Sequence, residues 1–215
     1  MISESRKLWK AVLLVGPTGS GKTPLGRLLG RQGLKNGTQC LHLDFGEALR
    51  ASAGRPAGPL NCSERRVVEE SLSTGALLEN GHFHIAKKLL SHHLAGRNAS
   101  RDTLVILNGI PRHTGQAEAM RSVVDMQMVV SLECQPAVVW ERIKTNAGGD
   151  REERADDTLE EVEKRVELFR RRTAPLLGYY RETGVSVLSL EIGVRTTAHE
   201  MRSQLLAGWS GMVRR

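Results

Sequence analysis

The stretch GPTGSGKT, residues 16–23, restricts the possible folds of this chain more than any other part of the sequence. It fits the pattern G-x-x-x-x-G-K-[ST], and it lies between an apolar run, Ala11–Val15, and a helical pattern over 22–32. In such a loop the backbone N–H groups wrap around an anion, and the helix that follows points its positive end at the same anion. The pattern therefore predicts a strand–loop–helix unit that binds phosphate groups. The residues predicted to form this site are Gly16, Gly19, Ser20, Gly21, Lys22 and Thr23.

Two side chains of this loop predict the ligands. A lysine at the position of Lys22 reaches the β- and γ-phosphates of a nucleotide, and a hydroxyl at the position of Thr23 binds Mg²⁺, so we expect ATP and Mg²⁺ as cofactors. The chain contains no N-K-x-D motif, which GTPases use to bind guanine, and it is short for a motor protein. A small-molecule kinase remains as the expected class.

Short apolar runs alternate with helical patterns along the whole chain. Such alternation predicts a parallel α/β sheet joined by right-handed crossovers, and we expect one P-loop domain over 1–215 with three αβα layers and five parallel strands. The expected strands are Ala11–Val15, Cys40–Asp44, Thr103–Asn108, Met128–Glu133 and Val185–Leu190. The expected helices lie near 22–32, 64–73, 82–94, 115–122, 136–145, 157–172 and 197–208.

Composition limits the class of partner. The chain has 215 residues, a net charge of +7 and only 4% aromatic residues. Its positive charges are spread along the sequence, and it is poor in the aromatic platforms on which single-stranded nucleic acid stacks, so we expect no nucleic-acid partner. Three separate cysteines, Cys40, Cys62 and Cys134, and the lack of a long apolar segment favour a cytoplasmic protein without a membrane partner.

Four further stretches resemble, in family order, segments of adenylate kinases and related nucleoside monophosphate kinases. NGIPRHTGQAEAM, residues 108–120, is similar to their D-G-[FY]-P-R-x-x-x-Q-A segment. Residues 154–180 resemble the segment after their lid: Arg-x-Asp-Asp, an arginine eleven positions after the first, and then Pro-Leu-x-x-Tyr-Tyr. LDFGEALR, residues 43–50, resembles the stretch that ends in an acceptor-binding arginine, and TGALLENGHF, residues 74–83, resembles a glycine–leucine stretch of the acceptor-binding insertion.

The resemblance implies roles on the acceptor side of the site. Arg50 and Arg112 would bind the phosphate of the acceptor nucleotide, because the planar guanidinium fork matches pairs of phosphate oxygens. Gln116 would hydrogen-bond to the acceptor base, and Gly109 would let the backbone approach the ligand closely. The alternative for Arg112 is a structural salt bridge. An acceptor-binding insertion would span 45–95.

On the donor side, the resemblance implies that Arg142 packs against the donor base. Arg154 and Arg165 would brace the transferred phosphoryl group, and surface ion pairs are the alternative role for both. A short lid would span 145–155. Closure of the insertion and the lid would exclude water, which competes with the acceptor.

The chain departs from the family at three places of the expected site. The phosphate loop reads Gly-Lys-Thr-Pro where adenylate kinases typically read Gly-Lys-Gly-Thr, and the other two places are single residues. Asn108 stands where the family usually has an aspartate that contacts Mg²⁺ through water, and asparagine keeps an acceptor oxygen but loses the charge. Asp44, at the end of another expected strand, could supply that charge, act as a base toward a hydroxyl acceptor, or only cap a helix. Asn146 stands where family lids usually carry a further arginine.

Taken with the residues, the resemblance implies a monomeric kinase that transfers the γ-phosphoryl group of Mg-ATP to a nucleoside monophosphate, with AMP as the expected acceptor. Two alternatives stay open. One is a P-loop kinase with a different small-molecule acceptor. The other is a catalytically weak ATP-binding regulatory protein, for which Asn108 and Asn146 would mark the loss of catalysis.

Overall fold

The computed structural model of the chain describes residues 8–35, 38–55, 58–100, 102–150 and 158–212. Five parallel strands form one sheet in the order β2-β3-β1-β4-β5, which confirms the predicted five-stranded parallel sheet. Because β1 is central, the loop that follows it leaves the middle of the carboxyl edge, where open α/β sheets bind their ligands. The strands are β1 (Trp9–Val15), β2 (Cys40–Asp44), β3 (Leu104–Asn108), β4 (Val124–Glu133) and β5 (Val187–Glu191).

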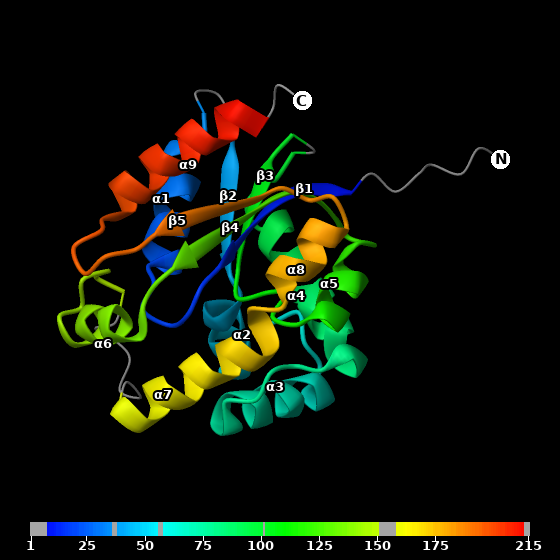
Figure 1. The fold of residues 1–215 in the computed structure, drawn as a ribbon. Coiled ribbons are helices and arrows are strands. Elements are labelled where there is room, and N and C mark those ends of the chain that lie inside the picture. The colour runs from blue at the N-terminus through cyan, green and yellow to red at the C-terminus, as the bar shows by residue number, and fades with distance from the viewer. Residues whose placement is uncertain (1–7, 36–37, 56–57, 101, 151–157, 213–215) are drawn as a thin grey trace.

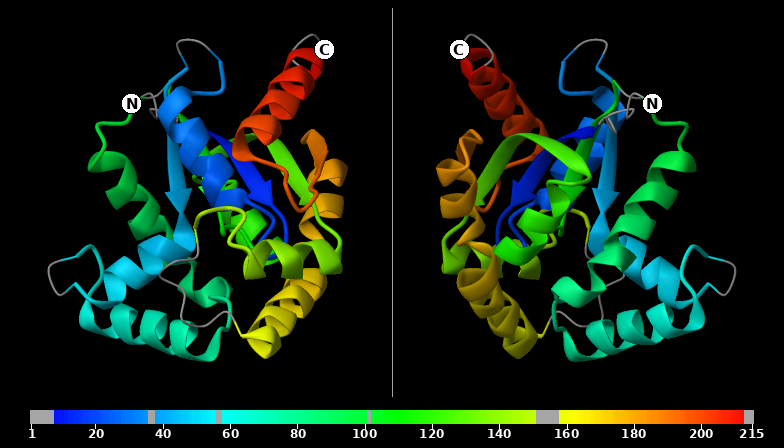
Figure 2. Two further views of the ribbon diagram at one scale, coloured as in Figure 1. Left: turned by 90° about the vertical axis from the view of Figure 1, so that its left-hand side faces the viewer. Right: turned by 90° about the vertical axis from the view of Figure 1, so that its right-hand side faces the viewer.

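Helices cover both faces of the sheet (Figures 1 and 2). One face carries α1 (Lys22–Gln32) and α9 (Ala198–Met212), and the other carries α4 (Phe83–Ala95), α5 (Thr114–Met120) and α8 (Leu176–Glu182). No helix in the described parts of the chain is long and apolar enough to cross a membrane.

The central strand β1 explains why its sequence is a continuous apolar run. Successive side chains of a strand point to opposite faces. Val12 and Leu14 therefore join the core under α1 and α9, whereas Leu13 and Val15 join the core under α4, α5 and α8. A strand that is buried on both faces has no polar alternation.

Four helices lie beyond the carboxyl ends of the strands (Figure 1). They are α2 (Phe45–Ala53), α3 (Cys62–Thr74), α6 (Pro136–Lys144) and α7 (Leu159–Leu168). The segment 45–95 also contains the short turn η1 (Asn80–His82) and builds a core of its own around Phe45, Val68 and Ile85, which Ile110 joins from the turn after β3. This helical segment therefore packs against the exit of β3.

Several elements differ from the prediction. Helix α2 was not predicted; it starts directly after β2 because the Asp44 carboxylate accepts a hydrogen bond from the Glu47 N–H. The helix expected over 157–172 ends its regular part at Leu168 and continues as a π-helical segment, η2 (Phe169–Thr173), followed by the unpredicted α8. Strand β4 begins at Val124, before the continuous apolar run, because its first residues alternate: Asp125 and Gln127 are exposed, whereas Val124 and Met128 are buried.

Helix α1 approaches β2 closely because a glycine faces the strand. A Cβ atom added at Gly26 would lie 2.3 Å from Nε2 and Cδ2 of the His42 ring. Burial lowers the pKa of His42 below its ordinary value, which keeps this packed ring neutral. The approach places the first turn of α1, with Thr23, against the end of β2.

We expect Gly26→Ala to lower the free energy of unfolding by about 1–3 kcal/mol, because the new methyl group overlaps the His42 ring. This outcome would reverse the usual helix preference, in which alanine is better than glycine by about 1 kcal/mol. Gly178→Ala in α8 is the matched control, since a Cβ atom there would meet nothing within 4 Å. Urea unfolding of the two variants checks the expectation, and equal stabilisation by both substitutions would contradict it.

Candidate functional site

The phosphate loop has the backbone that its sequence predicts. Gly19 and Gly21 have φ values of 78° and 95°, in the left-handed region that favours glycine. A Cβ atom at Gly19 would lie 2.9 Å from Cγ1 of Ile143, so packing also requires the missing side chain. The Lys22 ammonium folds over the loop and donates to the carbonyls of Gly16 and Pro17, both at 2.7 Å. The lysine therefore stands at the place where phosphates would enter.

Ser20 and Thr23 of the same loop are both buried, in different surroundings. Ser20 is fully buried, and its hydroxyl has no hydrogen-bond partner within the described residues. Thr23 is 7% exposed, and its hydroxyl donates to Oδ2 of Asp44 at 2.6 Å. The loop is thus tied to the end of β2 through Thr23.

Asp44 and Asn108 end neighbouring strands and share this contact. Nδ2 of Asn108 lies 2.9 Å from Oδ2 of Asp44 and 3.0 Å from Oγ1 of Thr23. Oδ1 of Asp44 accepts from the Glu47 N–H at 3.0 Å, so the residue is at once a helix cap and a member of this cluster. The three predicted metal-site residues, Thr23, Asp44 and Asn108, therefore lie together, and their role as metal ligands stays a prediction.

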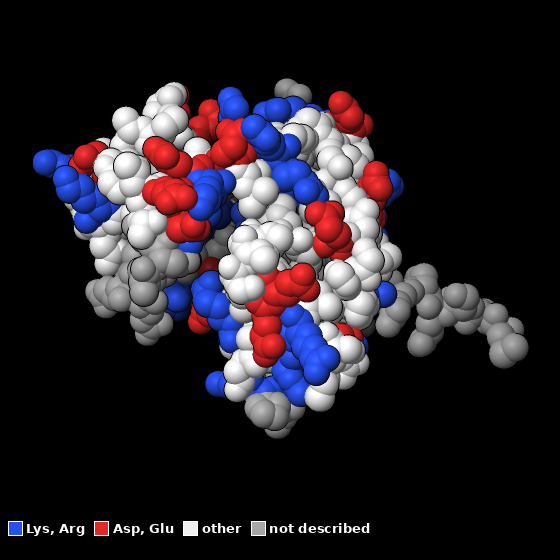
Figure 3. Space-filling model, turned by 90° about the horizontal axis from the view of Figure 1, so that it is seen from below, with Lys and Arg blue, Asp and Glu red and all other residues white. Residues whose placement is uncertain are grey.

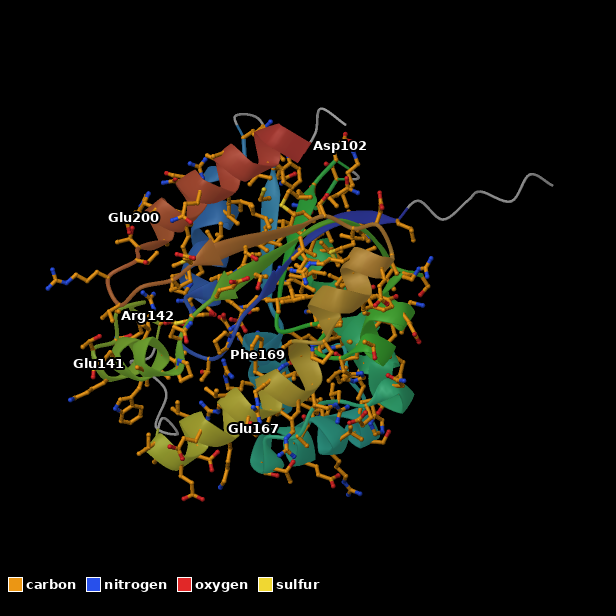
Figure 4. All side chains as sticks on the ribbon, viewed as in Figure 1. Asp102, Glu141, Arg142, Glu167, Phe169 and Glu200 are labelled. Atoms are coloured by element: carbon orange, nitrogen blue, oxygen red, sulfur yellow. The ribbon has the colours of Figure 1, made fainter. Side chains whose placement is uncertain are left out.

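Arg142 lies on α6 beside the turn between β5 and α9 (Figure 4). It is 2% exposed, and burial lowers the pKa of its guanidinium below the ordinary value. Nε donates to the Gly19 carbonyl at 3.0 Å, and Nη1 donates to the carbonyls of Gly193, Val194 and Thr196 at 2.8 to 3.0 Å. Arg142 thus joins the phosphate loop to the β5–α9 turn, and its contact with a donor base stays a prediction.

The turn after β3 carries the other predicted residues. Gly109 has φ 84°, and the turn continues through a cis Ile110–Pro111 bond to Arg112. Oε1 of Gln116 accepts from the Arg112 N–H at 2.8 Å, and Nε2 of Gln116 donates to the Leu78 carbonyl at 2.7 Å. Gln116 is 3% exposed, so both ends of its amide position this turn, and its contact with an acceptor base stays a prediction.

Sequence reasoning missed two residues that support the turn. Nδ1 of His113 accepts from the Gln116 N–H at 3.3 Å, and its Nε2 lies 3.1 Å from the Leu78 carbonyl. The Thr173 hydroxyl, on η2, donates to the Arg112 carbonyl at 2.9 Å. The only sequence signal for His113 is its place directly after Arg112, and nothing local marks Thr173, which lies 61 positions away.

The predicted phosphate-binding arginines differ in their surroundings. Burial lowers the pKa of Arg112 below its ordinary value, and the positive charge of Arg165 on α7 lowers it further. The structure therefore places Arg165 near Arg112, and their roles in binding phosphate stay a prediction. Arg50 is exposed at the last turn of α2. Arg154 and residues 151–155 of the expected lid lie outside the described residues.

The face that contains the carboxyl edge is not uniformly basic. Lys and Arg side chains are interspersed there with Asp and Glu side chains (Figure 3). A cavity of about 610 Å³ adjoins the phosphate loop at Pro17 and extends past Cys134 and Val139 to Phe169 and Gly193. Positive charge is therefore not a general property of this face.

Comparison with known proteins identifies similar chains. Residues 14–185 match the adenylate kinase family. An adenylate kinase of Xanthomonas campestris pv. campestris (strain B100) is 32% identical over 183 residues, covering 80% of this chain and 86% of the relative. An adenylate kinase of Synechococcus sp. (strain WH7803) is 29% identical over 184 residues, covering 82% and 87%.

Among solved structures, a gluconokinase from Sinorhizobium meliloti 1021 is similar to this chain with a TM-score of 0.53. The two chains are 16% identical, and the similarity covers 97% of this chain and 96% of the other. At this identity the likeness supports the P-loop kinase-like fold alone.

We expect Arg142→Lys to lower the free energy of unfolding by about 2 kcal/mol, because a lysine cannot donate hydrogen bonds both to the Gly19 carbonyl and to the carbonyls of the β5–α9 turn. Urea unfolding measures the loss, and faster amide hydrogen exchange over 193–197 should accompany it. Arg195→Lys, at an exposed position of the same turn, is the control and should change neither quantity. Equal free energies of unfolding and equal amide exchange rates in the two variants would contradict the role assigned to Arg142.

Proposed function

This chain belongs to the adenylate kinase family, and on that premise we propose that it transfers the γ-phosphoryl group of Mg-ATP to a nucleoside monophosphate, with AMP as the first acceptor to test. The proposal includes a monomeric protein that acts in the cytoplasm on small nucleotides, without a nucleic-acid or membrane partner. Family membership and the P-loop kinase-like fold support a phosphotransferase; the identity of the acceptor is the finer part of the proposal.

The single observation that carries the proposal is the meeting of two features at one edge of the sheet. The phosphate loop follows β1, and Arg112, with Arg165 of α7 near it, follows β3. The positive charge of Arg165 lowers the pKa of Arg112, and a bound anion would favour the charged form of this guanidinium. A donor phosphate on the loop and an acceptor phosphate at Arg112 would supply that anionic charge from both sides.

On the donor side, the backbone of Gly16, Gly19, Ser20 and Gly21 would hold the phosphates, and Lys22 would leave its two carbonyl partners to bind the γ-phosphate. Arg142 would border the donor base. The family implies Mg²⁺, and the donor set fits it: Thr23, Asp44 and Asn108 offer hydroxyl, carboxylate and amide oxygens, the hard ligands that Mg²⁺ prefers. Bound with ATP, Mg²⁺ neutralises charge on the β- and γ-phosphates.

On the acceptor side, Arg50 and Arg112 would grip the acceptor phosphate, Gly109 would let it approach the backbone, and Gln116 would contact the base. Arg154 and Arg165 would stabilise the charge that spreads over the moving phosphoryl group. Phosphoryl transfer requires little covalent chemistry from a protein, so alignment and charge stabilisation supply most of the catalysis. Segments 45–95 and 145–155 would close over the ligands and exclude water.

A second candidate is a kinase of the same fold with a hydroxyl acceptor. The observation that favours it is the state of Gln116, whose amide is engaged at both ends by backbone groups. An acceptor without a base would leave those bonds intact. Asp44 would then be the group available to take the hydroxyl proton. In this case nucleoside monophosphates would not be consumed.

We expect Arg112→Ala to lower kcat/KM for the preferred monophosphate by about 10²–10³-fold, because one charged donor to the reacting phosphates is lost. A coupled assay of ADP formation with Mg-ATP and AMP, GMP, CMP, UMP or dTMP measures it and names the acceptor. Arg66→Ala, at an exposed position of α3, is the matched control. No turnover with any monophosphate, despite ATP binding, would reject the proposed function.

A further inference from the structure

We propose that positions 44 and 108 accept one carboxylate between them, at either position but not at both. Because the carboxylate here is that of Asp44 on β2, position 108 must be a hydrogen-bond donor. Besides its proposed part in the metal site, Asp44 is a positioning residue: it orients Thr23 for Mg²⁺ and at the same time starts the helix that carries Arg50. The part of this inference that concerns Mg²⁺ rests on the proposed function.

The first step of the inference rests on the direction of the hydrogen bonds at Thr23. The Thr23 hydroxyl has one proton, and the neighbouring Asp44 oxygen can only accept, so the proton points to Asp44 at 2.6 Å. Nδ2 of Asn108, at 3.0 Å, occupies one acceptor direction of the same hydroxyl. The second lone pair of Thr23 remains for a cation. Asp44 and Asn108 together thus fix the rotation of the Thr23 hydroxyl.

The second step concerns the identity of residue 108. Its side chain is 4% exposed and faces Oδ2 of Asp44 at 2.9 Å. An asparagine meets the carboxylate with an N–H group, whereas an aspartate would put two carboxylate oxygens at hydrogen-bond distance without a proton between them. Like charges in such a site are strongly unfavourable. Asn108 is therefore the residue that an acid at position 44 requires, and it is no sign of a lost metal site.

The third step joins this pair to the acceptor side. No loop separates β2 from α2, because Asp44 is the last residue of the strand and Phe45 the first of the helix. The second oxygen of Asp44 caps α2 through the Glu47 N–H, and Arg50 lies in the last turn of that helix. Phe45 is 4% exposed and anchors the helix start in its core. One carboxylate thus holds the hydroxyl of the donor site and the start of the acceptor helix.

The structure suggests a direct test by exchange of the two side chains. In Asp44→Asn/Asn108→Asp, the new amide can still cap α2 with its oxygen, since asparagine is a good N-cap. Its N–H group can donate to the new carboxylate at 108, which can also accept from Thr23. The exchange keeps every donor–acceptor match and moves the charge from β2 to β3. Each single substitution instead puts two amides or two carboxylates opposite each other.

Thermal unfolding in EDTA without nucleotide is the first measurement, on the wild type, both single variants and the double variant. We expect each single substitution to lower Tm by about 5 °C or more, and the double exchange to recover most of that loss. Asp102→Asn, at an exposed position, is the isosteric control and should leave Tm unchanged. Additive losses in the double variant would overturn the proposal. If Asn108→Asp does not fold, recovery of folded protein by the double exchange supports the proposal, and failure to recover it overturns it.

Mg²⁺ dependence of ATP binding, followed by calorimetry, is the second measurement. We expect Asp44→Asn to raise the half-saturating Mg²⁺ concentration at least about tenfold, and the double exchange to return it to within about threefold of the wild type. A lower half-saturating Mg²⁺ concentration for Asn108→Asp than for the wild type would overturn the proposal. Neither measurement requires turnover of a monophosphate, so failure of the proposed function and failure of this inference are distinguishable.

Discussion

The hydrogen bond between Thr23 and Asp44, 2.6 Å long, is the contact on which the site depends. It joins the first turn of the phosphate-loop helix to the end of an edge strand, and both partners are fixed by other contacts. Gly26 lets α1 lie against the His42 ring of β2, so the helix and strand are close enough for the bond to form. The same carboxylate starts α2. The phosphate loop and the helical segment 45–95 are therefore both held by the Asp44 carboxylate.

The arginines of the chain illustrate how burial separates roles that look alike in sequence. Arg142 is buried with its donors directed at four backbone carbonyls, so it holds the phosphate loop against the β5–α9 turn. Arg112 lies where burial and Arg165 both lower its pKa, which is an arrangement that favours binding of an anion. Both were expected from the resemblance to touch a nucleotide. The surroundings of Arg142 indicate that its first role is structural.

The departure from the family at position 108 is compatible with the side chain beside it. An asparagine at position 108 looks like the loss of a metal-site acid when it is considered alone. Beside Asp44 it is the donor that an anionic neighbour needs. Gln116 is comparable, because its amide holds the turn of Arg112 and the Leu78 carbonyl. These contacts hold the phosphate loop, the end of β2 and the turn after β3 in one arrangement.

The sequence alone determined the sheet, the phosphate loop and the family, because these depend on patterns within short stretches: apolar runs of strand length, glycines at set spacings and ordered motifs. It also predicted that Thr23, Asp44 and Asn108 belong to one site. It did not determine their hydrogen bonds, the break of the helix at Phe169, or the partners of Arg142 and Gln116. Asn108 and Thr23 are 85 positions apart, and Arg142 and Gly19 are 123 apart. Only the packing of helices on the sheet decides which of such distant groups meet, because each buried polar group must find whatever partner the fold brings within reach.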